Sequence, residues 1–519
     1  MNLERKGELA LRIYGLALIA QALCRVRYFY YAAESIASFD HDVRIGLGLW
    51  VQAVCLALPP LFGICLLSFL ARPVSRMLFR GTESPGDSGY HDAIHIGVAL
   101  AVVWLVQGIF TLPALLALVE PVFLVVLLPC AIGVCVIAQP RRLRSFLSGC
   151  AFGWRNDSAD NAKWLGTAFV IMAVVMLMAY SMRFIGIVLA YVSDVSHPIA
   201  RQAIRVGIID EAFGALLAVA LMLESGRLAA LLTPRKDEGG SARSGFSLDN
   251  ATEYFFIAVC LACAYVFFHY VLRLVQSPFH SWRGPAAVGA LLYFLAVPTG
   301  VAFAIFFVAG RFAPRIAATF SRQPMRPLDA NIVVPSFQIG LTIIALHFAK
   351  WHLSLASAGR VSTLWSWRTD YDSSMRVVCL LAFLWCMLSL VIKGDLAWLL
   401  CRTPRSCDAR SKTEFAALLR PWLVLLGVWT VMPALPHVIG KLVEKITCAV
   451  TRTVPRVDAD FLVSDANTTW GAGLVLVFGL VLIFGARPLA RFLSFGRLLP
   501  HVWRTSRLQD AHREGMDDG

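Results

Sequence analysis

The sequence predicts an all-α, polytopic membrane protein, a helical bundle with about 12 transmembrane helices. Its 519 residues are 58% apolar and 15% charged, whereas soluble domains average roughly 45–50% apolar and about 25% charged residues. Twelve apolar stretches recur along the chain, most of them near the roughly 20 residues that a helix needs to cross a hydrocarbon core. The longest hydrophilic stretch, residues 444–469, is too short for a separate soluble domain. We therefore expect residues 1–519 to form a single membrane domain.

The apolar stretches are expected to be helices, because they lack the alternation of apolar and polar residues that a barrel strand requires. Lipid also leaves no backbone group without an internal partner. In chain order, the predicted spans are residues 10–33, 45–70, 93–118, 121–138, 164–193, 206–224, 253–276, 286–310, 331–356, 376–393, 418–440 and 470–486. The first is expected to be a membrane helix and not a cleaved signal peptide, because it contains Arg12 and lacks a small-residue cleavage site.

A short basic phrase follows the second span of each successive pair. The stretch at 71–78, ARPVSRML, returns at 486–493 as ARPLARFL, and Gly226, Gly310 and Gly394 begin looser copies that are 84 residues apart. We call the copies the basic feet; they comprise residues 71–78, 139–144, 226–232, 310–316, 394–400 and 486–493. Self-similarity at a fixed period indicates repeated architecture. We expect six tandem helical hairpins in one orientation, at approximately 1–80, 93–147, 164–233, 253–318, 331–402 and 413–494.

The basic feet are predicted to be short amphipathic helices in the membrane interface. Their arginines recur at positions i and i+4, which places the charges on one face of a helix and the apolar residues on another. Such a face suits anionic phospholipids or an acidic cytoplasmic protein partner. The residues expected to make these contacts are Arg72, Arg76, Arg141, Arg142, Arg227, Arg311, Arg315, Arg487 and Arg491.

The distribution of basic residues predicts the topology. With the termini and the basic feet on one side, that side carries about 30 Lys and Arg residues against about 16 in the loops within the hairpins. We therefore expect both termini in the cytoplasm, with residues 495–519 as a basic tail. Arginine outnumbers lysine 39 to 8, which suggests a GC-rich bacterial genome and hence a bacterial inner (plasma) membrane.

Polar or basic residues recur in the first helix of each hairpin, toward its predicted periplasmic half. The candidates for substrate binding are Arg25, Arg183, His269, Arg273, His347, Lys350 and His437. Ionisable groups inside a span are costly and usually face a bundle interior or a wet cavity. Together they could form a cationic vestibule for an anionic solute or a lipid headgroup, and Arg183 is expected to lie deepest. The alternative is that these side chains snorkel to the outer interface or hydrogen-bond between helices.

The sequence offers little sign of catalysis. It contains no Walker loop, dinucleotide fingerprint, HExxH or GxSxG motif, and we assign no catalytic residue, metal, cofactor or nucleic-acid partner. Cys260 and Cys263 have metal-like spacing but lie in an apolar run, so we interpret them as core residues. Asp210 and Glu211 are interpreted as carboxylates at the N-terminus of a helix.

Three functional hypotheses follow. The first is transport or conductance of an anionic solute or lipid through the repeat-built bundle. The second is a non-catalytic membrane scaffold or complex subunit whose basic feet bind anionic lipid or an acidic partner. The third is a membrane enzyme acting on a lipid-linked substrate, using the periplasmic-side histidines and acids. Prolines within the spans, including Pro433 and Pro436, are expected to free backbone groups that neighbours or water must satisfy.

Overall fold

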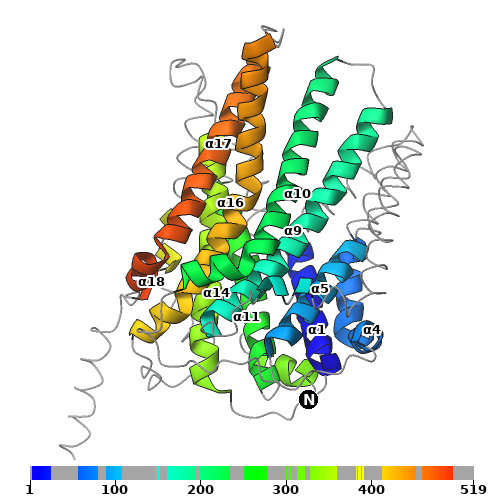
Figure 1. Ribbon diagram of the computed structural model, residues 1–519. Coiled ribbons are helices and arrows are strands. Elements are labelled where there is room, and N and C mark those ends of the chain that lie inside the picture. The colour runs from blue at the N-terminus through cyan, green and yellow to red at the C-terminus, as the bar shows by residue number, and fades with distance from the viewer. Residues whose placement is uncertain are drawn as a thin grey trace, which may run out of the picture.

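The protein is an all-helical membrane protein in the part of the chain that the computed structural model describes (Figure 1). That part comprises residues 3–24, 57–79, 89–107, 146–147, 149–151, 160–193, 198–233, 250–276, 300, 304, 312–321, 328–358, 382, 384–386, 388–390, 412–451 and 459–494. Within it, 7 helices are long and apolar enough to cross a membrane, or 8 if one bent pair is counted as a span. The chain is therefore a multi-pass membrane protein.

The helices follow the apolar stretches of the sequence. In chain order the principal elements are α1 (Leu3–Cys24), the π-helix η1 (Leu66–Leu70), α4 (Ala71–Phe79), α5 (Gly89–Gln107), α9 (Asp160–Ser193), α10 (Pro198–Leu232), α11 (Ala251–Gln276), α14 (Ala330–Ala358), α16 (Lys412–Thr451), α17 (Ala459–Phe484) and α18 (Ala486–Ser494). The predicted span 121–138, all of 286–310 except residues 300 and 304, and most of 376–393 lie outside the described residues. The apolar part of α5, Tyr90–Trp104, is shorter than a span. The count of twelve helices therefore stays a prediction.

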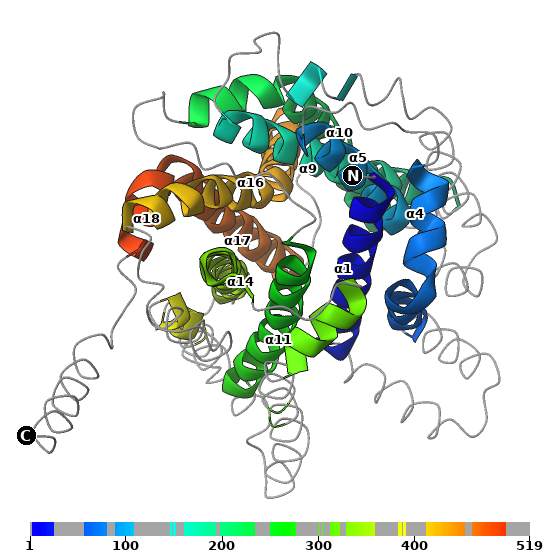
Figure 2. The same ribbon diagram turned by 90° about the horizontal axis from the view of Figure 1, so that it is seen from below.

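Eight of these helices form a closed ring of contacts. The order around the ring is α1, α11, α14, α17, α16, α10, α9 and α5, and α5 packs against α1 again. Figure 2 shows this order from below, with α14 also lying against α16. The chain thus brings its first helix beside one that begins at Ala251, near the middle of the sequence.

Two antiparallel pairs extend beyond the rest of the bundle. Figure 1 shows α9 with α10 and α16 with α17 rising past the other helices at the end opposite the N-terminus. At 1.5 Å per residue, the 34 residues of α9 and the 40 of α16 measure about 51 and 60 Å. A hydrocarbon core is about 30 Å thick, so both pairs project from the membrane.

Paired glycines let two helix crossings close to backbone contact. A Cβ atom added to Gly15 of α1 lies 2.7 Å from the carbonyl oxygen of Gly63, and one added to Gly63 lies 2.6 Å from that of Gly15. The crossing of α16 and α17 repeats the arrangement, with 2.8 Å from Gly427 to the Gly479 oxygen and 3.0 Å in the reverse direction. Small residues at such crossings are typical of membrane bundles, where close packing replaces the hydrophobic effect.

The two closest copies of the basic foot are helices in one register. In α4, Ala71 and Ser75 are buried while the arginines face outward, and in α18 the buried positions are Ala486 and Ala490. α18 lies at 77° to the end of α17, as expected for an interfacial helix, whereas α4 continues the helix of Ala57–Phe79. The copy at 226–232 forms the last turns of α10, and that at 310–316 leads into a helix at 312–321. The copies at 139–144 and 394–400, with Arg141 and Arg142, lie outside the described residues, as does Arg311.

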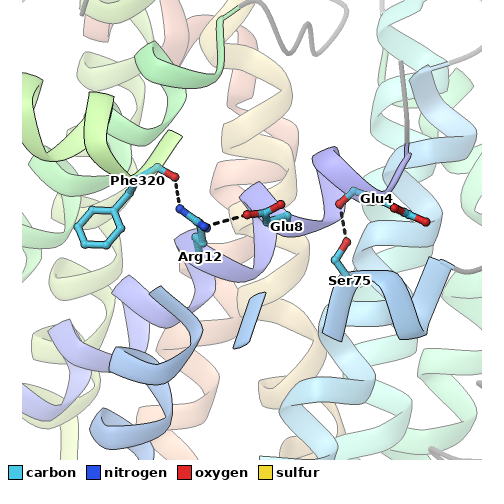
Figure 3. Close-up of polar contacts among 5 residues, drawn as sticks. All are labelled: Glu4, Glu8, Arg12, Ser75 and Phe320. Atoms are coloured by element: carbon cyan, nitrogen blue, oxygen red, sulfur yellow. Dashed lines mark hydrogen bonds and ion pairs between the residues drawn. The ribbon is translucent and has the colours of Figure 1, made fainter. Parts of the chain in front are cut away.

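Polar contacts anchor α1 at the end of the bundle that carries the feet (Figure 3). The buried Arg12 guanidinium lies 2.8 Å from Glu8 Oε1 and also donates to the Phe320 carbonyl oxygen in the last turn of helix 312–321. The Ser75 hydroxyl donates to the Glu4 carbonyl oxygen and so joins α4 to α1. Because the last carbonyls of a helix lack intrahelical partners, Arg12 caps helix 312–321.

Candidate functional site

Four ionisable side chains meet where α9, α10 and α16 pack together. Arg183 of α9 lies 3.9 Å (Nη1 to Oε1) from Glu211 of α10. The neighbouring Asp210 places Oδ2 3.3 Å from Nδ1 of His437 on α16. We call Arg183, Asp210, Glu211 and His437 the ionisable cluster. The structure thus brings together two of the residues singled out in the sequence, Arg183 and His437, through two carboxylates.

The cluster lies at one depth on all three helices. Arg183 is 21 residues beyond the start of the apolar span at Ala162, and His437 is 22 residues beyond Phe415. Asp210 precedes the end of its span at Leu232 by 22 residues. These separations correspond to about 32–33 Å along each helix, slightly more than the roughly 30 Å of a hydrocarbon core. The cluster therefore lies near the ends of these apolar spans that face away from the feet.

The interpretation of Asp210 and Glu211 as residues at a helix N-terminus was wrong. α10 begins at Pro198, so both carboxylates lie more than three turns inside the helix and outside the reach of its first-turn dipole. The polar residues before Asp210 belong to the part of α10 that projects beyond the membrane. What stabilises the two carboxylates is contact with the basic residues of α9 and α16.

The cluster is nearly balanced in charge and incompletely hydrogen-bonded. Its carboxylates outnumber Arg183 two to one, and a proton on His437 makes the set neutral. Among the described residues, no hydrogen-bond partner is found for the buried Asp210 Oδ1 and Glu211 Oε2. The Arg183 side chain is 66% exposed, and at 3.9 Å from Glu211 it makes an ion pair without a hydrogen bond. Arg183 is thus the accessible cation of the cluster, and the carboxylates behind it retain unused acceptor capacity.

Two glycines allow the three helices to approach closely enough for this arrangement. A Cβ atom added to Gly440 of α16 lies 1.6 Å from Asp210 Oδ1, so the carboxylate rests directly on the α16 backbone. One turn below Asp210, a Cβ added to Gly214 lies 2.4 Å from the Tyr180 ring. A larger residue at either position would displace the side chains that form the cluster or its floor.

The Tyr180 hydroxyl replaces a backbone hydrogen bond that α16 lacks because of a proline. Its hydroxyl donates to the Met432 carbonyl oxygen of α16 at 2.9 Å. In an α-helix that oxygen accepts from the N–H four residues later, and here the residue is Pro436, which has no N–H. The expectation that neighbours satisfy the groups freed by helix prolines is confirmed at this position.

We expect the Tyr180→Phe protein to lose about 1 kcal/mol of unfolding free energy, because the Met432 carbonyl then has no donor. In a Pro436→Ala background the helix regains its own N–H donor, so the same substitution should cost much less. Unfolding of the purified protein in mixed detergent, followed by circular dichroism, measures both differences. An equal loss in the two backgrounds would show that the hydroxyl does not replace the missing N–H.

The other predicted substrate-binding residues lie on α11 and α14. The buried His269 ring and the half-buried His347 ring both lie against the Phe348 ring, with centroid distances of 6.4 and 5.8 Å. Lys350 is half-buried on the same helix. Burial lowers the pKa of the nearby His352 to about 4, so this imidazole is uncharged at neutral pH. Arg25 and the side chain of Arg273 lie outside the described parts of the chain.

Helices α9 and α16, which lie in different halves of the chain, share a pattern that was not predicted from the sequence. Trp164 of α9 packs edge-on against Trp422 of α16, with ring centroids 4.8 Å apart. Each tryptophan is followed by leucine, and 19 residues later each helix carries a basic residue, Arg183 or Lys441. The repeated Trp-Leu pair and the equal spacing could have identified these two helices as counterparts.

No metal centre is found among the described residues, since they include no group of three or more His, Cys, Asp or Glu side chains placed to hold an ion. Cys260 is buried and Cys263 half-buried, and both are free thiols. No known protein family, curated protein or solved structure matches the chain.

Proposed function

We propose that this protein transports a small anionic solute, or an anionic lipid by its headgroup, and that Arg183 is the cation that receives it. The observation that carries the proposal is the ionisable cluster, with its exposed arginine backed by two incompletely paired carboxylates at the membrane boundary. Ionisable groups that pair with one another between membrane helices often mark a solute or proton pathway.

The arrangement of the helices supports a transporter built from repeats. The counterparts α9 and α16 pack against each other. So do α1 and α11, the first helices of the first and fourth predicted hairpins. Contact between matching elements is the arrangement expected when two parallel halves surround a central axis. We further propose that the protein has twelve spans in six hairpins. We place it in a bacterial inner membrane with both termini in the cytoplasm. In that orientation the ionisable cluster faces the periplasm.

The cluster also supplies a means of coupling the anion to a proton. An anion bound to Arg183 takes the place of Glu211 as the partner of the guanidinium. Glu211 is then left beside the like charge of Asp210, whose own partner is His437, while the Tyr180 hydroxyl is committed to the Met432 carbonyl. A proton taken up by the carboxylate pair removes this repulsion. We therefore propose that anion and proton bind together.

Binding can be tested by the thermal stability of the purified protein with inorganic phosphate, succinate or dihexanoyl phosphatidylglycerol. A ligand at 100 times its Kd should stabilise the protein by about 2.7 kcal/mol. We expect Arg183→Gln to lose this shift and Arg183→Lys to retain part of it. The control Arg227→Gln, at the opposite end of α10 where Glu224 already neutralises the arginine, should retain all of it. The phosphate, succinate and lipid samples separate the solute from the headgroup. An equal gain in thermal stability in the Arg183→Gln protein would show that Arg183 does not bind the anion.

A further inference from the structure

The two basic feet α4 and α18 expose the same pattern of side chains although 415 positions separate them. In α4 the exposed residues are Arg72, Pro73, Arg76 and Met77, and in α18 they are Arg487, Pro488, Arg491 and Phe492. The buried face of each helix is fixed by its small residues, so each exposed face is held in one orientation. The shared register makes the exposed face a repeated feature of the molecule.

Each exposed face joins positive charge to an apolar side chain. Met77 and Phe492, which directly follow the second arginine, are 63% and 73% exposed. Among the described residues, no carboxylate lies within ion-pair distance of Arg72, Arg76 or Arg491. A third foot repeats the combination, because the Arg315 guanidinium lies over the Phe312 ring at 5.9 Å.

Each foot lies at the end of an apolar helix. α4 is the last part of the helix Ala57–Phe79, and α18 follows the apolar end of α17 through the bend at Gly485. Through Ser75 and Glu4, α4 is tied to the first turn of α1. We infer that these helix ends lie at the membrane surface, where lipid phosphates are found with acyl chains directly beneath them.

We propose that α4 and α18 are binding sites for anionic phospholipid headgroups. The arginine pair of each foot binds the phosphate and the anionic headgroup, and Met77 or Phe492 inserts among the acyl chains below. Anionic lipid is the occupant because the faces are cationic, lie beside membrane spans, and carry the apolar group that a soluble anion does not need. An arginine near a charged membrane surface contributes a preference on the order of fivefold.

The foot at the end of α10 offers a matched control within the same chain. Arg227 is exposed like the other foot arginines, but Nη1 lies 3.1 Å from both carboxylate oxygens of Glu224. This arginine is already neutralised by a neighbour on its own helix. It should add little to the preference for anionic lipid.

The test uses the full-length protein in phosphatidylcholine vesicles that contain spin-labelled phosphatidylglycerol or spin-labelled phosphatidylcholine. Electron paramagnetic resonance gives the ratio of the two association constants. We expect phosphatidylglycerol to associate on the order of tenfold more strongly than phosphatidylcholine, or more, as several arginines together should give. This preference should fall toward one in the Arg72→Gln, Arg76→Gln, Arg487→Gln, Arg491→Gln variant, and it should weaken in high salt.

Two further proteins make the outcome decisive. The four-lysine variant at the same positions keeps the charge and should keep most of the preference, and the Arg227→Gln protein should match the wild type. If the four-glutamine protein folds and keeps the full preference, or if Arg227→Gln lowers it equally, the feet are not the lipid sites. If the four-glutamine protein fails to fold, the single Arg76→Gln and Arg491→Gln proteins must each lower the preference, and unchanged values would overturn the proposal.

Discussion

The Gly479→Ala protein should lose about 1–3 kcal/mol of unfolding free energy, the usual cost of overpacking a close contact. The added Cβ lies 2.7 Å from Val431 Cγ2 and 3.0 Å from the Gly427 carbonyl oxygen, so α16 and α17 must separate to admit it. Because that crossing holds one of the two projecting pairs, we also expect the cluster on α16 to be disturbed. Reversible unfolding in mixed detergent measures the change.

Gly473, on the same helix, is the matched control. Among the described residues, no heavy atom other than those of its chain neighbours and of its own helix backbone lies within 4 Å of a Cβ added there. Alanine is the better helix former by up to about 1 kcal/mol, so Gly473→Ala should leave stability unchanged or raise it. Equal behaviour of the two alanine variants would mean that α16 and α17 do not cross at Gly427 and Gly479.

The Arg12→Met protein should be destabilised by about 3–5 kcal/mol, because the poorly solvated Glu8 carboxylate loses the guanidinium that pairs with it. The Arg12 and Glu8 side chains are 4% and 17% exposed. The substitution also removes the donor that caps helix 312–321 at Phe320. The free energy of unfolding in mixed detergent checks the size of the loss.

A double-mutant cycle separates the charge from the cap. The Arg12→Met, Glu8→Leu protein no longer contains the Glu8 carboxylate, so most of the loss should be recovered, with a remainder from the uncapped end of helix 312–321. Losses that simply add would show that Arg12 and Glu8 do not interact within the membrane.

The sequence predicted the helices well where lipid surrounds them and poorly where they leave it. Hydropathy detects the part of a helix that faces hydrocarbon, so α9, α11 and α14 were expected close to their observed positions. The more polar segments Pro198–Asp210 and Lys441–Thr451 are not detected as helices by their hydropathy, although they belong to α10 and α16. Because the polar start of α10 was not predicted to be helical, Asp210 and Glu211 were wrongly placed at the start of a helix.

The candidate site was predicted in part. Arg183 and His437 stood out because an ionisable side chain in an apolar run is costly. Their carboxylate partners could not be assigned, because Asp210 and His437 are 227 residues apart and no local pattern links them. The register of the feet, in contrast, could be predicted from a few neighbouring residues. Small residues and arginines recur there at helical spacing, and the structure buries the small residues and exposes the arginines.

The most direct test of the transport proposal is anion flux into proteoliposomes that contain a trapped pH indicator. We expect an anion that stabilises the wild-type protein to enter together with protons. The rate should fall at least about tenfold in Arg183→Gln, the loss expected for one charged contact, and should stay unchanged in Arg227→Gln, whose arginine is already paired with Glu224. Equal flux through the wild type and a folded Arg183→Gln protein, or no flux of any anion that binds, would contradict a transporter and favour the membrane scaffold.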